Sequence, residues 1–251
     1  IEHVVQENSL PTSWPTIVKQ ESASLKINLD NLIRKNLSNI AFVTIDGEDA
    51  KDFDDAVFCV EHTDGYDLYV AIADVSLYVK PGSNIDKEAI NRGTSIYFPN
   101  FVIPMLPEVL SNNLCSLKPN EDRPSLVVKI NLDKDCYLRK YNFFSAIIHS
   151  HARLTYTEVE NNSFESPLSN AVIDSLKNLK SLAHKRILIK DKRGAVRIHS
   201  KEHIIKINDD GTSKAISFRK NIFANQMIEE CMLLANECAA DLLNNRFGYA
   251  P

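Results

Sequence analysis

The chain has 251 residues, of which 44% are hydrophobic and 25% are charged, a composition typical of one large globular domain or two small ones. It contains no apolar run of about 18 residues, so no membrane-spanning helix is predicted. The net charge of −4 disfavours a nucleic-acid-binding surface spread over the whole molecule, and leaves a basic face or separate modules as the ways to attract phosphate.

The first five residues include no Met and no signal-peptide pattern, so we expect the chain to be part of a longer protein. Five cysteines are scattered without a C-x-x-C pair. This spacing predicts reduced, buried thiols in a cytoplasmic protein rather than a disulfide framework or a metal site. The residues are Cys59, Cys115, Cys136, Cys231 and Cys238.

The first part of the chain is predicted to change from irregular structure to helix and then to strands. Residues 1–20 hold two prolines around Trp14 and read as a connector, whereas 21–39 are predicted to be largely helical. Short apolar runs then predict strands that are covered on both faces. These runs lie at 40–45, 56–60 and 68–73, and Asp64-Gly65 predicts a hairpin between the last two.

The second part combines hairpins with longer helices. The three prolines of 99–107 predict a loop. Hairpins are expected from 125–132 with 136–148, and from 204–207 with 215–218 around Asp210-Gly211. Helices are expected at 86–91, 155–161, 169–190 and 220–245. The predicted fold class is α+β, with a mixed, mostly antiparallel sheet and packed helices.

The stretch from Thr44 to Val57 carries the clearest chemical signal. Six acidic residues occupy ten positions between two predicted strands: Asp46, Glu48, Asp49, Asp52, Asp54 and Asp55. Carboxylates this close repel one another and raise one another's pKa. A divalent cation offsets that repulsion, and Mg²⁺ prefers carboxylate oxygens while keeping several waters. The stretch therefore predicts a magnesium site.

Two structural alternatives compete with this hypothesis. On composition alone, a solvated acidic turn has equal standing, because charge runs usually form exposed faces. A calcium loop of the EF-hand type is the second alternative, but Gly47 stands at the wrong place in the pattern. The two flanking strands favour a site that is held against the core.

The same stretch, Asp-Gly-Glu-Asp-Ala-Lys-Asp-Phe-Asp-Asp-Ala, resembles the metal-binding signature of the RNase II/RNase R family, the RNB domain. Further blocks are similar to family motifs in the same order, from about residue 40 to 240, and they read closer to the RNase R branch. Linked motifs in one order are far more specific than a single motif. The further blocks that match family motifs are Ala71–Ser76, Arg92–Pro99, Pro104–Glu108, Leu110–Asn112, Leu114–Leu117, Ser150–Tyr156 and Ile228–Asn236.

The resemblance implies an RNB-type catalytic domain that hydrolyses single-stranded RNA processively from its 3′ end. Nucleoside 5′-monophosphates would be released by a two-metal mechanism in cytoplasmic RNA turnover, and the enzyme is expected to be a monomer. The resemblance implies Mg²⁺ as the cofactor, with Mn²⁺ as a substitute. The matching catalytic and metal-site residues are Asp46, Asp52, Asp54 and Asp55, and Asp55 is the position where the family tolerates loss least.

The resemblance also implies RNA-binding residues. Tyr97 matches a tyrosine that stacks near the 3′-terminal nucleotide, and Tyr156 matches a position that senses the 2′-hydroxyl. Either Glu229 or Glu230 is expected to contact the ribose. Arg153 is expected either to hold a phosphate or to be a plain surface arginine.

The chain departs from the family pattern in two respects. Ile198 stands where the family usually has an aromatic residue. We further expect 1–20 to be the tail of a preceding cold-shock-type module, and 21–251 to be the amino-terminal part of an incomplete catalytic domain that is weakly active or inactive alone. A non-catalytic RNA-binding scaffold and a cation-stabilised structural module remain the alternatives.

Overall fold

The computed structural model describes residues 2–26, 29, 33–99, 101–196, 203–208, 213–218 and 221–248. These residues divide into two compact units. The first unit comprises residues 1–28, 75–114 and 197–220, and the second comprises 29–74, 115–196 and 221–251. The predicted boundary at residue 20 stays a prediction.

The second unit is built on a six-stranded sheet with the order β1-β8-β2-β3-β4-β7, in which β7 also pairs with β8. Four neighbouring pairs are antiparallel, while β8 runs parallel to β1 and β2. The predicted mixed, mostly antiparallel sheet is thus confirmed. The strands are β1 Lys35–Asn36, β2 Phe42–Asp46, β3 Asp55–His62, β4 Gly65–Ala73, β7 Asp122–Asp133 and β8 Leu138–Thr155.

Strand β8 changes partner along its length. Its first part pairs with β7 as far as His149, and its last part pairs with β2 from Ser150 to Thr155. In this register Asp46, the last residue of β2, stands beside Thr155. The end of β8 is thereby placed next to the start of the acidic stretch.

The hairpin between β3 and β4 turns at Thr63-Asp64, as predicted. Gly65 follows the turn with φ +145°, a conformation that residues with a side chain rarely adopt. A Cβ added there would lie 2.0 Å from the carbonyl oxygen of Leu132 on β7. Only glycine therefore allows β4 to enter the sheet between β3 and β7.

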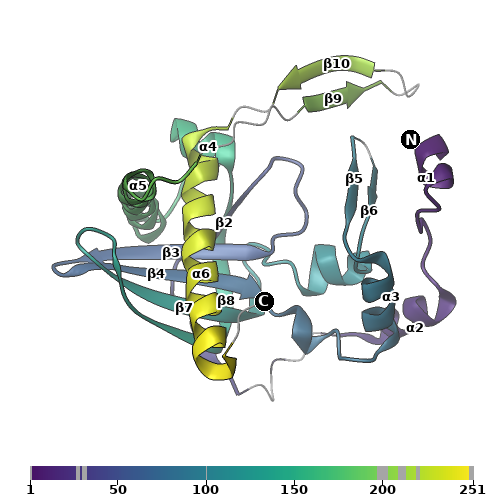
Figure 1. Ribbon diagram of the computed structural model, residues 1–251, viewed down its shortest axis with the longest axis horizontal. Coiled ribbons are helices and arrows are strands. Elements are labelled where there is room, and N and C mark those ends of the chain that lie inside the picture. The colour runs from purple at the N-terminus through teal and green to yellow at the C-terminus, as the bar shows by residue number, and fades with distance from the viewer. Residues whose placement is uncertain are drawn as a thin grey trace. The chain divides into compact units, whose positions relative to one another are not determined.

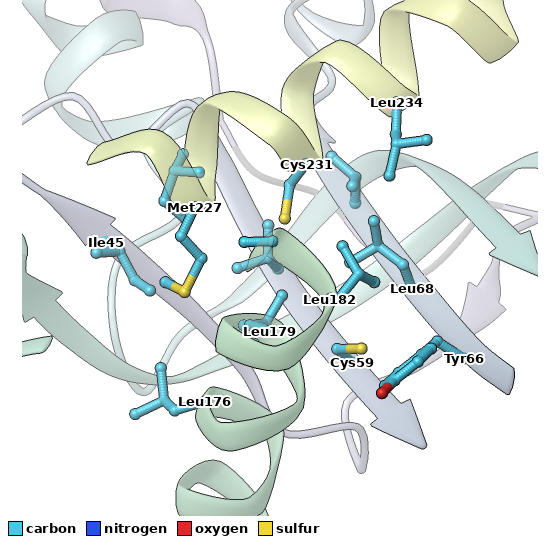
Figure 2. Packing of buried hydrophobic residues seen from close by; sticks show 14 of the residues in the cluster. Ile45, Cys59, Tyr66, Leu68, Leu176, Leu179, Leu182, Met227, Cys231 and Leu234 are labelled. Atoms are coloured by element: carbon cyan, nitrogen blue, oxygen red, sulfur yellow. The ribbon is translucent and has the colours of Figure 1, made fainter. Parts of the chain in front are cut away.

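Helices α5 (Asn170–Lys192) and α6 (Phe223–Phe247) cover one face of this sheet (Figure 1). Their apolar side chains pack against strand residues such as Leu68, Cys59 and Tyr66 (Figure 2). Full burial of one such aliphatic side chain contributes about 1.5–3 kcal/mol. The core residues supplied by the helices include Leu176, Leu179, Leu182, Met227, Cys231 and Leu234.

The helices of the second unit agree with the sequence prediction to within three residues at either end. Helix α4 (Tyr156–Asn161) begins at a capping box, in which Thr155 accepts from the Glu158 N–H and Glu158 accepts from the Thr155 N–H. Helix α6 ends at Gly248 in the left-handed conformation, with φ 78°.

The first unit contains short elements, several of which differ from the prediction. Residues 1–20, predicted to be irregular, contain one helix and the start of a second. The helical structure predicted over 21–39 is confirmed only as far as Ser24, and the other described residues of that range are not helical. The predicted proline-rich loop at 99–107 contains one three-residue strand, which pairs with another three-residue strand just before the loop; both strands are too short to show periodicity. The elements are α1 Glu2–Glu7, α2 Thr16–Ser24, η1 Val75–Leu77, α3 Asn84–Arg92, β5 Ile96–Phe98, β6 Phe101–Ile103, η2 Leu110–Leu114, β9 His203–Ile207 and β10 Ser213–Phe218.

The β9–β10 pairing confirms the predicted hairpin. Its turn residues Asp210 and Gly211, like Ile198, lie outside the described residues.

All five cysteines are buried and form no disulfide, as predicted. Burial raises the pKa of each thiol, to about 12 for Cys115 and to about 11 for Cys136 and Cys238. The thiols are therefore poor nucleophiles at neutral pH. Within the part of the chain that the structure describes, no helix combines the length and apolar character that crossing a bilayer demands.

Candidate functional site

The four aspartates of the acidic motif lie at one end of the β2–β3 pair. Asp46 ends β2 and Asp55 begins β3, while Asp52 and Asp54 lie in the connection at residues 47–54, here called the aspartate loop. Because Val43 pairs with Val57 in antiparallel register, the Asp46 end of β2 lies opposite the Asp54-Asp55 end of β3.

The carboxylates share one electrostatic environment. Burial, followed by the charges of Asp52 and Asp54, raises the pKa of Asp46 to about 6. Burial and then the charges of Asp46 and Asp54 raise the pKa of Asp55 to about 7. The pKa of Asp54, the more exposed of the three, is raised by partial burial and by Asp52. Burial together with this mutual repulsion shows that the region around Asp46, Asp52, Asp54 and Asp55, here called the acidic corner, carries excess negative charge.

No described residue forms a hydrogen bond or ion pair with the side chains of Asp46, Asp52, Asp54 or Asp55, and Arg153 provides only a weaker attraction to Asp46. Among the described residues, no three His, Cys, Asp or Glu side chains form a ready-made metal ligand set. The chemistry of the donors nevertheless fits a hard divalent cation, because they are crowded, partly desolvated carboxylates without a cationic partner among the described residues.

Burial of Asp55 and its repulsion by Asp46 and Asp54 predict that removing its charge stabilises the fold. In metal-free chain, Asp55→Asn should raise the free energy of unfolding by on the order of 1 kcal/mol at pH 8, and less at pH 5. A carboxyl whose folded-state pKa is raised contributes stability at low pH that is lost as the pH rises, here between about 4 and 7. Thermal unfolding in EDTA at the two pH values measures the difference. A lower melting temperature for the variant at pH 8 would show that the Asp55 charge is compensated.

Arg153 on β8 contacts the backbone of the aspartate loop. Its Nη2 donates to the carbonyl oxygens of Gly47 at 2.8 Å and Glu48 at 2.7 Å. The guanidinium lies 5.8 Å from the centre of the Phe53 ring. Arg153 is therefore more than a plain surface arginine, and its described hydrogen bonds are to the loop.

Tyr156 begins α4 directly after Thr155, the residue paired with Asp46. It is half-buried and packs against the main core. The parallel pairing of β2 with β8 thus places the end of the acidic strand beside the first turn of α4.

Glu229 and Glu230 on α6 occupy different environments. Glu230 is only 2% exposed, whereas Glu229 faces solvent. Lys190 at the end of α5 binds both, with Nζ 2.7 Å from Glu230 and 3.0 Å from Glu229. Its hydrogen bond to Glu230 raises the pKa of Lys190. The sequence did not identify Lys190, because it lies some 40 positions from its partners.

Cys231 on α6 lies close enough to the aspartates to feel the charge of Asp55. Burial raises the pKa of its thiol, and the nearby charges of Asp55 and Glu230 raise it further. The first turns of α6 therefore lie beside the start of β3. Figure 2 shows the Cys231 side chain pointing from α6 toward the core.

Tyr97 belongs to the first unit and is described within it alone. It lies on β5, pairs with Val102 and is 69% exposed. In the same unit, Arg92 holds the hairpin by donating to the Pro104 carbonyl oxygen at 3.1 Å and covers the Trp14 ring. The structure thus presents the Tyr97 ring on a small, supported hairpin.

A hollow of about 360 Å³ lies beside Arg153, at the start of α4. Its lining includes Glu48, Thr155 and Glu158, and none of the four aspartates. The hollow is therefore distinct from the acidic corner.

Comparison with known proteins shows extensive similarity. The family model described as RNB domain matches residues 34–250. Ribonuclease R of Escherichia coli is 42% identical over 249 residues, which cover 96% of this chain and 30% of the relative. Ribonuclease R of Vibrio parahaemolyticus is 40% identical over 247 residues, covering 95% of this chain and 30% of the relative. The chain thus spans about 30% of the length of these curated relatives.

A solved structure gives the same result in three dimensions. Mycoplasma genitalium RNase R in complex with double-stranded RNA is 35% identical, with a TM-score of 0.94 over 98% of this chain and 45% of that protein. The α+β arrangement described above is thus the arrangement of the matching part of that enzyme.

Proposed function

The chain belongs to the RNB domain family, whose matching relatives are ribonuclease R exoribonucleases, and from this membership we propose that it carries the metal site of a 3′→5′ exoribonuclease. The observation that supports the proposal most directly is the cluster of four aspartates, in which burial and then neighbouring carboxylates raise the pKa of Asp46, Asp54 and Asp55 without a described counter-ion. A scaffold that only binds RNA has no need of such a cluster.

We assign the cation site to Asp46, Asp52, Asp54 and Asp55, with Mg²⁺ as the natural ion and Mn²⁺ as a substitute. When bound, two such ions would lower the pKa of a water molecule and offset the charge of the scissile phosphate. The chain's own contribution is to hold four acidic oxygen donors at one end of the sheet.

The reaction we propose is processive hydrolysis of single-stranded RNA to nucleoside 5′-monophosphates, in cytoplasmic RNA turnover by a monomer. Tyr97 would stack on a terminal base, a contact worth roughly 1–3 kcal/mol that tolerates any base. Tyr156, with Glu229 or Glu230, would contact the ribose, where a 2′-hydroxyl separates RNA from DNA. Arg153 would act on the aspartate loop rather than on phosphate.

We further propose that the 251-residue chain alone degrades RNA weakly or not at all, because it spans only about 30% of the length of its curated relatives. The net charge of −4 agrees with phosphate-binding modules elsewhere in a complete enzyme.

The test of this function is the cation dependence of a full-length protein that carries the chain. With single-stranded RNA as substrate, Mg²⁺ or Mn²⁺ should support release of nucleoside 5′-monophosphates, and Ca²⁺ or EDTA should not. Chromatography of the products identifies the monophosphates. Tight RNA binding without cation-dependent cleavage would favour the scaffold instead, and stabilisation by Ca²⁺ alone would favour a structural module.

A further inference from the structure

The second half of the aspartate loop is fixed by a buried serine from outside the acidic motif. Ser116 is fully buried, and its hydroxyl accepts from the Phe53 N–H at 3.1 Å and donates to the Lys51 carbonyl oxygen at 3.0 Å. Neighbouring main-chain bonds extend this contact, from the Leu117 N–H to the Phe53 carbonyl oxygen and from the Ala73 N–H to the Asp54 carbonyl oxygen.

The first half of the loop is fixed by Arg153 on β8. One guanidinium nitrogen of Arg153 donates to the carbonyl oxygens of both Gly47 and Glu48. The guanidinium group also faces the buried Phe53 ring. Charge-assisted bonds of this kind are stronger than bonds between neutral groups. Ser116 and Arg153 lie about 64 and 106 positions from the backbone they hold, so neither contact follows from the motif itself.

These contacts oppose the repulsion within the loop. Asp52 and Asp54 flank Phe53, whose N–H, carbonyl oxygen and ring are all held. Without those bonds the loop could relax by turning its carboxylates apart into solvent. Ligands are effective only when a supporting layer of contacts holds them near their binding geometry.

We propose that Ser116 and Arg153 are positioning residues, which hold the backbone of the aspartate loop in the conformation that lets its carboxylates bind a divalent cation. The inference rests on the proposed function and adds two residues to the site. In this role Arg153 acts on the loop backbone instead of on the phosphate that the resemblance offered as its partner.

The experiment measures Mn²⁺ binding to the 251-residue chain at pH 8 without RNA, by the electron paramagnetic resonance signal of free Mn²⁺. Ser116→Ala and Arg153→Met should each weaken Mn²⁺ affinity by about tenfold, the effect of losing one or two hydrogen bonds. The matched controls are Ser145→Ala and Arg139→Met, which change exposed residues of β8 and should leave Mn²⁺ affinity unchanged.

The sign of the Arg153→Met result separates positioning from simple electrostatics. Removing a positive charge beside a cation site should tighten cation binding if charge alone matters. Weaker binding is expected only if the lost contacts with Gly47 and Glu48 held the loop. Unchanged or tighter Mn²⁺ binding by Arg153→Met would overturn the proposal for this residue.

A second measurement reports on the loop itself. Amide hydrogen exchange at Phe53 should accelerate in Ser116→Ala, because this N–H loses its acceptor. Melting temperatures distinguish a purely structural role, in which stability falls but folded protein binds Mn²⁺ normally, an outcome that contradicts the proposal. Arg153 is only half-buried, so Arg153→Met keeps the test available if Ser116→Ala does not fold.

The outcomes also separate this inference from the proposed function. If the unsubstituted chain binds no Mn²⁺, the assigned cation site and the positioning role fall together. If it binds Mn²⁺ and both variants bind equally well, only the positioning role is overturned.

Discussion

Asp55→Asn in a full-length protein carrying this chain should lower the turnover of single-stranded RNA by about 10²–10⁴-fold, while RNA affinity changes little. Asparagine keeps the shape of the side chain but loses its charge. The transition state then loses several kcal/mol of cation-dependent stabilisation, so the activation barrier rises. RNA binding is spared because its electrostatic part comes from basic groups elsewhere. Single-turnover cleavage in Mg²⁺ and fluorescence anisotropy with labelled RNA measure the two quantities separately.

Asp49→Asn is the matched control for this prediction. Asp49 lies in the same aspartate loop, is exposed, and has no role in the proposed cation site. The same chemical change should therefore leave turnover within about twofold of the unsubstituted enzyme, as expected for a solvated charge. Equal losses in Asp49→Asn and Asp55→Asn would mean that total loop charge, rather than the Asp55 position, controls catalysis.

Lys190→Met should lower the free energy of unfolding by about 2–3 kcal/mol, because it leaves the buried Glu230 without its cation. For a chain of this size such a loss lowers the melting temperature by about 5–10 °C. Methionine keeps the length of the lysine stem, so the change isolates the charge. Urea unfolding followed by circular dichroism measures the effect.

Two further variants identify the source of that loss. Glu229→Gln removes the exposed partner of the same lysine and should cost under about 1 kcal/mol. The double variant Lys190→Met with Glu230→Gln should be more stable than Lys190→Met alone, because no unpaired buried charge remains. A double variant as unstable as the sum of both single changes would locate the loss in packing instead.

Much of the second unit followed from local sequence patterns. The apolar runs before and after the acidic motif form β2 and β3, and the periodic segments before Lys192 and before Gly248 form α5 and α6. The prediction failed in parts of the first unit. Helix α2 begins directly after Pro15, and the β5–β6 hairpin consists of strands too short for an alternating pattern to appear.

The candidate site divides in the same way. The six crowded acidic residues can be read from the sequence alone, because like charges at such spacing need compensation wherever the chain places them. The sequence also determined the family, because linked motifs occur in one order. Which carboxylates carry the raised pKa depends on burial, and burial depends on the pairing of β2 with both β3 and β8.

Only the tertiary structure decided which residues support that motif. Ser116 and Arg153 lie in motif blocks that the sequence revealed, but nothing local predicts their contacts with the aspartate loop, which lies about 64 and 106 positions away. Lys190 likewise pairs with Glu230 from 40 positions away. Contacts over such separations form when strands and helices pack, and they depend on register and on the direction of single side chains. The sequence by itself therefore determined the type of chemistry, and the tertiary packing of Ser116 and of Arg153 on β8 against residues 47–54 decided which side chains hold the aspartate loop in place.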